Sequence, residues 1–315
     1  MAARRLGAQT GSKIVDRLFV AVLFAAAIVF LAIIAGLAIE LTRGSLLSLK
    51  TFGFRFLWTS EWNPITNIFG ALPLIYGTII SSLIAIVLAG VFGIFAAIFL
   101  ADFAPRALAR PLSFIIELLA AVPSVVFGLW GLFVLAPAMR TVIDPALQKV
   151  FGFLPIFSGP SYGVGLLTAG VVLALMIVPT VTAFSRDVIA TIPVDQREAS
   201  MSLGATRWET MMKVVVPAAR AGIFGAVILA LGRALGETIA TTMVIGNRPE
   251  IAVSLFAPSY TLASVIANEF TEATTDVYLS SLVELGLLLL IVSIIVNGAA
   301  RMLMWSVFRG ARSAR

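Results

Sequence analysis

The sequence predicts an all-α, polytopic membrane protein whose chain crosses the bilayer six times. Of its 315 residues, 60% are hydrophobic and only 12% are charged, and the mean hydropathy is +1.06. A soluble domain carries roughly 25% charged residues, so this chain has too few to cover a surface that faces water. Six apolar runs reach the ~20 residues that a helix needs to cross a bilayer. Lipid is therefore the expected solvent.

The six predicted spans divide the chain. In order, they are Leu18–Ile39, Leu74–Leu100, Leu112–Ala136, Gly165–Ala183, Ala218–Ile245 and Leu279–Trp305. The first run is longer than the apolar core of a secretory signal and lacks a closing A-x-A site, so we expect an uncleaved anchor. The predicted organisation is a tail (1–17), a first transmembrane helix (18–41), an outer segment (42–72), a transmembrane domain (73–306) with a long loop at 186–217, and a second tail (307–315).

Basic residues predict the orientation of these spans. Lysine and arginine concentrate in cytoplasmic loops and tails. Fifteen of the 22 basic residues fall on the side of the N-terminus: Arg4, Arg5, Lys13, Arg17, Arg106, Arg110, Arg186, Arg197, Arg207, Lys213, Arg220, Arg301, Arg309, Arg312 and Arg315. Six fall on the other side: Arg43, Lys50, Arg55, Arg140, Lys149 and Arg248. Both termini are therefore predicted to be cytoplasmic, and 42–72 to be periplasmic.

Composition also excludes several kinds of chemistry. The chain has no cysteine and no histidine, which rules out disulfides, thiolate chemistry, Cys/His metal sites and histidine-based catalysis. It has no G-x-x-x-x-G-K-[ST] loop to cradle the phosphates of ATP. The net charge of +6 would indicate nucleic acid in a soluble protein, but here the basic residues flank apolar runs. We expect no catalytic residue, no bound metal or cofactor, and no nucleic-acid partner.

The loop between the fourth and fifth spans carries the signals of two short helices. Asp195 and Glu198 have the spacing of a capping box. Gly204 can adopt a positive φ and end that helix. Thr206 and Glu209 form a second capping box, which begins another helix. The loop is therefore predicted to fold as two helices joined by a sharp glycine turn.

Apolar side chains interrupt the charged surface of this loop. They are Leu203, Trp208, Met211 and Met212, and Pro217 then marks the predicted entry to the next span. Exposed apolar contacts within a charged surface suit docking onto a soluble partner. The alternative is an ordinary cytoplasmic loop that lies along the lipid headgroups. The residue types alone do not separate the two readings.

The spacing in this loop resembles the EAA motif of ABC-importer permeases, E-A-A-x3-G-x9-I-x-L-P. Glu198-Ala199-Ser200 is followed after three residues by Gly204, and after nine more by Val214-x-Val216-Pro217. Serine replaces the third alanine, and valine replaces both aliphatic positions. The resemblance implies a type I ABC-importer permease bundle whose loop sits in a groove of a separate ATPase subunit. The implied contact residues are Glu198, Ala199, Ser200, Gly204, Trp208 and Pro217.

Four charged residues fall within or near the predicted spans: Glu117, Arg233, Glu237 and Glu284. A charge at the bilayer centre costs about 2.5–3.5 kcal/mol on insertion scales, so each needs a partner or a polar cavity. Arg233 and Glu237 are four residues apart and can pair on one helix face. Arg233 could complete a structural salt bridge, bind an anion in the transport pathway, or gate that pathway. Glu117 and Glu284 are expected to form hydrogen bonds between helices.

Two further strings resemble phosphate-importer permeases of the PstC and PstA kind. They are Leu231-Gly-Arg-Ala-Leu-Gly-Glu-Thr238 and Ala121-Val-Pro-Ser-Val-Val-Phe-Gly-Leu-Trp-Gly131. The aromatic outer segment looks more like PstC. The likeness covers roughly residues 72–306. It implies phosphate import across the cell inner membrane by a heterodimer with a second permease, two subunits that use ATP-Mg, and a periplasmic phosphate-binding protein.

Two other functions remain open at this stage. An arginine in the pathway fits any oxyanion, so sulfate, molybdate and phosphonate are alternatives to phosphate. An ion-coupled secondary carrier would favour broken helices with membrane carboxylates, and only Glu237 and its neighbours support it. A neighbouring reading frame that encodes a protein with the ATP-binding loop G-x-x-x-x-G-K-[ST] would distinguish the importer from the carrier.

Overall fold

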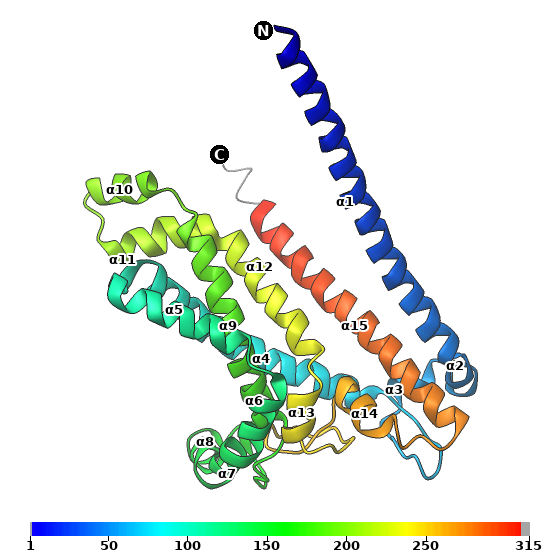
Figure 1. The fold of residues 1–315 in the computed structure, drawn as a ribbon. Coiled ribbons are helices and arrows are strands. Elements are labelled where there is room, and N and C mark those ends of the chain that lie inside the picture. The colour runs from blue at the N-terminus through cyan, green and yellow to red at the C-terminus, as the bar shows by residue number, and fades with distance from the viewer. Residues whose placement is uncertain (1, 310–315) are drawn as a thin grey trace.

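The computed structural model describes residues 2–309, with side chains for residues 15–305, and nearly all of this chain is helical (Figure 1). The helical elements are α1 (Ala2–Gly44), α2 (Leu46–Phe52), α3 (Arg55–Trp58), α4 (Leu72–Ile98), η1 (Phe99–Phe103), α5 (Arg106–Ala120), α6 (Ser124–Trp130), η2 (Gly131–Leu135), α7 (Ala136–Ala138), η3 (Met139–Ile143), α8 (Asp144–Phe151), η4 (Pro155–Phe157), α9 (Leu166–Ala190), α10 (Val194–Ser202), α11 (Arg207–Thr210), η5 (Met211–Val215), α12 (Val216–Leu235), α13 (Ile239–Val244), α14 (Leu262–Glu269) and α15 (Asp276–Arg309). The predicted all-α class is confirmed.

Six helical stretches are long and apolar enough to cross a membrane, as predicted. They are Val15–Gly44, Leu72–Phe103, Ser124–Phe151, Leu166–Ala190, Arg207–Leu235 and Asp276–Trp305. In Figure 1, α10 and α11 lie at the same end of the molecule as the start of α1 and the end of α15. The elements α2, α3, α8 and α14 lie at the opposite end.

Small residues bring the central helices together. The fourth span, α9, is the most enclosed, with 67% of its apolar window buried. A Cβ added to Gly170 of α9 would come within 2.5 Å of Ile84, and one added to Gly93 of α4 within 2.9 Å of Val181. The α12 face towards this core carries Ala226, Ala230 and Ala234, all buried. In lipid, where apolar burial does not drive association, such close backbone approach is what holds helices together.

The outer segment packs through aromatic rings onto α14 and the start of α15. Phe69 lies 4.8 Å from Trp62 and 5.1 Å from Tyr278, measured between ring centroids. The Trp62 indole N–H and the Tyr278 hydroxyl both donate to one carboxylate oxygen of Glu269, at 2.7 Å and 2.6 Å. Burial raises the pKa of the neighbouring Tyr260 hydroxyl. These contacts tie residues 46–71 to α14 and α15.

The third span differs from its prediction. The apolar run Leu112–Ala136 is not one helix, because α5 ends at Ala120 and a new helix begins at Ser124. Pro123 stands between them as the N-cap residue of α6, where a proline without an N–H costs nothing. The actual span runs from Ser124 to Phe151, so it continues well beyond the predicted end at Ala136. The helix α5 has no buried residue and lies outside the span.

The fifth span is also shifted towards the N-terminus. Its helix begins at Arg207 and ends at Leu235, whereas the predicted run was Ala218–Ile245. Pro217 is therefore the second residue of α12 within a continuous helix, not the entry to the span. The π-helical turn just before it, η5, displaces the carbonyl with which the proline ring would clash in a regular helix.

The two predicted tails are not separate from the first and last helices. The first helix begins at Ala2 and continues to Gly44, and the last helix runs to Arg309. The boundaries placed at residues 17 and 307 therefore fall inside helices.

Candidate functional site

The loop between α9 and α12 folds as a helical hairpin, made of α10, the turn at residues 203–206, and α11. Gly204 has φ +90°, the left-handed conformation predicted for it, and its amide donates to the Met201 carbonyl at 2.9 Å. The predicted capping box at Thr206 is also present. The Thr206 hydroxyl accepts from the Glu209 amide at 3.2 Å, and the Glu209 carboxylate accepts from the Thr206 amide at 3.0 Å.

The first capping box predicted for this loop is absent. The N-cap residue of α10 is Pro193, and it makes no side-chain capping bond. Asp195 lies inside the first helical turn instead. The proline sets the helix entry with its fixed φ, which shifts the start two residues upstream. The Asp195 charge still favours the positive end of the helix dipole.

One face of the hairpin exposes apolar groups to solvent. Leu203 at its tip is 90% exposed, Val194 62% and Met201 43%. Two of the predicted contact residues, Glu198 and Ala199, are exposed on the same helix. The hairpin therefore presents apolar side chains beside charged ones on its exposed surface.

The remaining predicted contact residues occupy different surroundings. Ser200 is half-buried, and its hydroxyl lies 3.0 Å from the Thr210 hydroxyl, which joins α10 to α11. Trp208 is 52% exposed, with its ring 6.0 Å from that of Phe103. Pro217 is exposed but belongs to the membrane span rather than to the hairpin.

A group of charged residues that the sequence analysis did not single out fixes the inner face of the hairpin. The Arg197 guanidinium in α10 donates to the Asp102 carboxylate at 3.1 Å and to the Ile189 carbonyl at 2.8 Å. Asp102 also accepts from Arg207 of α11, whose guanidinium stacks 5.6 Å from the Phe103 ring. Residues 95 positions apart give no local sequence signal for such a pair.

The predicted pairing of Arg233 with Glu237 does not form. The helix α12 ends at Leu235, so the two side chains no longer lie on one helix face. The Glu237 carboxylate instead accepts from the Ala240 amide at 3.1 Å and caps α13. Arg233 is exposed on the last turn of α12, and none of the ion pairs among residues 15–305 includes it. A buried structural salt bridge is therefore the wrong reading of Arg233.

Glu117 links two helices, as expected. Glu117 of α5 pairs with Arg186 of α9 at 2.9 Å. Glu284 of α15 is 3% exposed, and its Oε2 atom is buried without a hydrogen-bond partner among the described residues. The Ser48 hydroxyl of α2 lies 3.1 Å from that of Ser281 in α15. The expected hydrogen bond between helices is therefore confirmed for Glu117.

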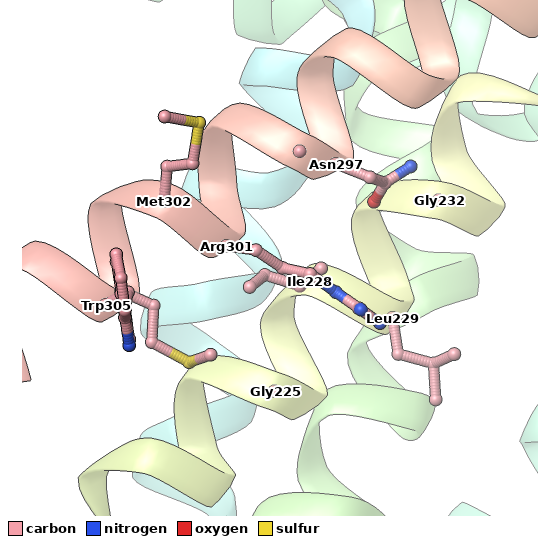
Figure 2. Close-up of a pocket in the computed structure, with 10 residues that line it drawn as sticks. Gly225, Ile228, Leu229, Gly232, Asn297, Arg301, Met302 and Trp305 are labelled. Carbon is pink, nitrogen blue, oxygen red and sulfur yellow. The ribbon is translucent and has the colours of Figure 1, made fainter.

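A groove of about 1050 Å³ opens between α12 and α15, and Figure 2 shows its lining. Gly225, Gly232 and Gly298 line it without side chains that would fill it, and Arg301 reaches across it from α15 towards Ile228 and Leu229 of α12. None of the ten lining residues is acidic. Arg233 is not among them. Within the part of the chain with described side chains, no group of three histidine, cysteine, aspartate or glutamate residues could hold a metal ion.

Comparison with known families identifies the family to which the chain belongs. The profile of the family described as "Binding-protein-dependent transport system inner membrane component" matches residues 90–307, which include the hairpin and the last four spans. The chain therefore belongs to this family of inner-membrane transport components.

Curated relatives narrow the likeness further. The chain is 50% identical to "Phosphate transport system permease protein PstC" of Mesorhizobium japonicum over 290 residues, which cover 91% of this chain and 89% of the relative. It is 46% identical to the protein of the same name from Pasteurella multocida, over 89% of this chain and 88% of that one. These matches confirm the resemblance to PstC that the sequence motifs indicate.

Solved structures share the fold at low identity. One chain of a bacterial ABC transporter involved in the import of the acidic polysaccharide alginate aligns over 92% of this chain and 96% of its own, with a TM-score of 0.61 and 14% identity. A chain of the MetNI methionine ABC transporter aligns over 74% and 93%, with a TM-score of 0.53 and 19% identity. The permease bundle predicted from the EAA-like loop is thus confirmed as a fold.

Proposed function

We propose that this chain is a membrane-spanning permease subunit that carries inorganic phosphate through the inner membrane as part of an ATP-driven importer. The observation that carries the proposal is the 50% identity to a phosphate transport system permease over 91% of the chain. An ion-coupled carrier does not account for the family match. It also leaves the apolar tip of the hairpin unexplained.

The hairpin is the proposed element that docks onto a separate ATPase subunit and is moved by it. Leu203, Val194 and Met201 form an apolar knob on a surface that also carries Glu198. Burial of such a knob in a groove of a soluble subunit removes apolar surface from water, which lowers the free energy of the complex. The chain has no loop that binds the phosphates of ATP, so ATP-Mg belongs to the partner. Ala199, Ser200, Gly204 and Trp208 shape this contact.

The proposed assembly contains four kinds of subunit. Beside this chain there is a second, homologous permease, two ATP-binding subunits, and a periplasmic phosphate-binding protein that delivers the anion. The excess of basic residues at the end that bears the hairpin supports a cytoplasmic location for the hairpin and both termini. The segment of residues 42–72 then faces the periplasm.

Arg233 is the proposed cationic element of the anion pathway. It is exposed on the last turn of α12, so its guanidinium is accessible to a ligand that approaches from outside this subunit. Guanidinium binds phosphate oxygens in a bidentate manner. Glu237 caps the next helix, α13, and is the second residue of the proposed pathway or its gate.

The test is anion-dependent ATP hydrolysis by the reconstituted complex with its binding protein. We expect phosphate to stimulate hydrolysis and to accumulate inside proteoliposomes. Sulfate, molybdate and phosphonate serve as parallel arms. Stimulation by one of these and not by phosphate would reassign the substrate, while hydrolysis that ignores all four anions would contradict the importer.

A further inference from the structure

The Asp102 carboxylate is a junction between three helices. It ends the long second span, at the π-helical turn η1, and is the only charged residue among residues 72–103. One of its oxygens accepts from Arg197 of α10 at 3.1 Å. The other lies 3.8 Å from the guanidinium of Arg207 in α11. Both helices of the hairpin are therefore held to the end of α4 by a single side chain.

Arg197 makes a second connection, to the end of the fourth span. Its other terminal nitrogen donates at 2.8 Å to the Ile189 carbonyl near the end of α9, which also accepts from the Ile192 amide at 3.3 Å. A cation at a helix C-terminus is favoured by the helix dipole. The two side chains are only 15% (Arg197) and 20% (Asp102) exposed, so the ion pair is shielded from solvent.

The position of this pair is more informative than its strength. Replacing a buried ion pair by apolar residues is often neutral for stability, so such a pair is best understood as fixing one arrangement among several. Here the arrangement is that of α10 relative to α4 and α9, which pack against each other along the core. Without the pair, α10 would be joined to the bundle through the backbone at residues 191–193 and 203–206 and through its packing on α11 and η5, which includes the Ser200–Thr210 hydrogen bond.

We propose that Arg197 and Asp102 form a strap that makes α10 a rigid extension of α4 and α9. The strap delivers the displacement of the hairpin directly to the two most closely packed spans. Arg197 is thus a positioning residue for transport, and it acts through the bundle. Met201 of the knob lies one turn further along the same face of α10 and lines a small cavity together with Arg197 and Asp102. This inference rests on the proposed function, because it requires a motor that moves the hairpin.

The test compares coupling with assembly in the complete reconstituted complex. In Arg197→Gln and Asp102→Asn, we expect the ATPase subunits to copurify at the wild-type ratio. Phosphate import should fall at least about tenfold while ATP hydrolysis falls less than about twofold, so the ATP consumed per phosphate rises. Arg197→Lys keeps the charge but not the fork that reaches Ile189, so an intermediate ratio is expected. A variant that is only less stable would lower both activities together.

The control is Lys213→Gln, which removes an exposed ion pair with Glu209 four residues earlier in the same continuous helix. It should leave the ratio of ATP consumed to phosphate imported unchanged. A cross-link supplies an independent arm, because the chain has no cysteine. In Asp102→Cys/Arg197→Cys, joining the two thiols with a short bis-maleimide should restore import that the unlinked protein lacks.

Three results would overturn the strap. The first is an unchanged ratio of ATP consumed to phosphate imported in Arg197→Gln. The second is a double-cysteine variant that imports phosphate before cross-linking and stops importing it afterwards. The third is loss of the ATPase subunits from both single variants. If the wild-type complex itself imports no phosphate, the proposed function fails instead.

Discussion

At the scale of single residues, Arg233 is the side chain whose change should affect transport most directly. Arg233→Gln removes the proposed charge-assisted contact with the anion, worth about 1.5–3 kcal/mol, so phosphate uptake should fall by about 10- to 100-fold. Membrane assembly should be unaffected, because Arg233 is exposed and makes no ion pair among residues 15–305. Uptake of labelled phosphate by cells checks this. Arg55→Gln, exposed on α3, is the matched control, and normal uptake by Arg233→Gln would end the pathway role.

A second residue-scale prediction concerns close packing in α4. A Cβ at Gly77 would lie 2.2 Å from the Tyr260 carbonyl oxygen, a backbone atom that cannot move alone. Gly77→Ala should therefore destabilise the fold by about 1–3 kcal/mol. Gly90 lies in the same helix with nothing within 4 Å of its added Cβ, so Gly90→Ala should be neutral or slightly stabilising. Thermal unfolding in detergent measures both, and equal melting temperatures would contradict the packing.

At the scale of elements, the shape of the hairpin depends on its glycine turn. Gly204→Pro imposes φ near −65° where the chain has +90°, and it deletes the hydrogen bond from this amide to the Met201 carbonyl. The knob at Leu203 should then be misplaced, and ATPase subunits should no longer copurify. Gly204→Asn is the control, because asparagine tolerates the left-handed conformation and should retain binding. A stoichiometric complex with the proline variant would show that this turn is not part of the docking surface.

Local signals in the sequence were sufficient for some elements and not for others. The capping box at Thr206, the glycine turn and the fourth span follow from adjacent residues, and the structure confirms them. The third span does not, because hydropathy alone cannot distinguish a membrane helix from the exposed amphipathic α5 that precedes Pro123. The start of the fifth span was missed since a π-helical turn allows Pro217 inside a helix.

In the candidate site, too, some features follow from local sequence signals and others only from packing. Exposure of Glu198 and Ala199 on α10 could be predicted from a motif with fixed spacing. The pair of Asp102 and Arg197 could not, because only the packing of α4 against α9 brings the two residues together. The pairing of Arg233 with Glu237 was wrong for a related reason. It assumed a helix that continues past Gly236, and the helix ends one residue earlier.

At the scale of the whole molecule, the six spans place the two ends of the bundle on opposite sides of a membrane, and charge predicts which side is which. The hairpin and the outer segment lie at opposite ends in Figure 1. Because the chain contains no cysteine, one introduced thiol is its only labelling site. Ser202 of α10 and Thr66 of the outer segment are both exposed, which makes Ser202→Cys and Thr66→Cys a matched pair.

In intact cells with a permeable outer membrane, an impermeant maleimide should label Thr66→Cys and leave Ser202→Cys unmodified. Permeabilising the inner membrane should make both react, which shows that burial is not the cause of protection. The physical reason is that the topology predicted from the sequence puts 15 of the 22 basic residues on the side of the hairpin, and an excess of basic residues marks the cytoplasmic side. If Ser202→Cys were labelled in intact cells, the hairpin would face away from any cytoplasmic ATPase. The exposed leucine at its tip would then need a different partner.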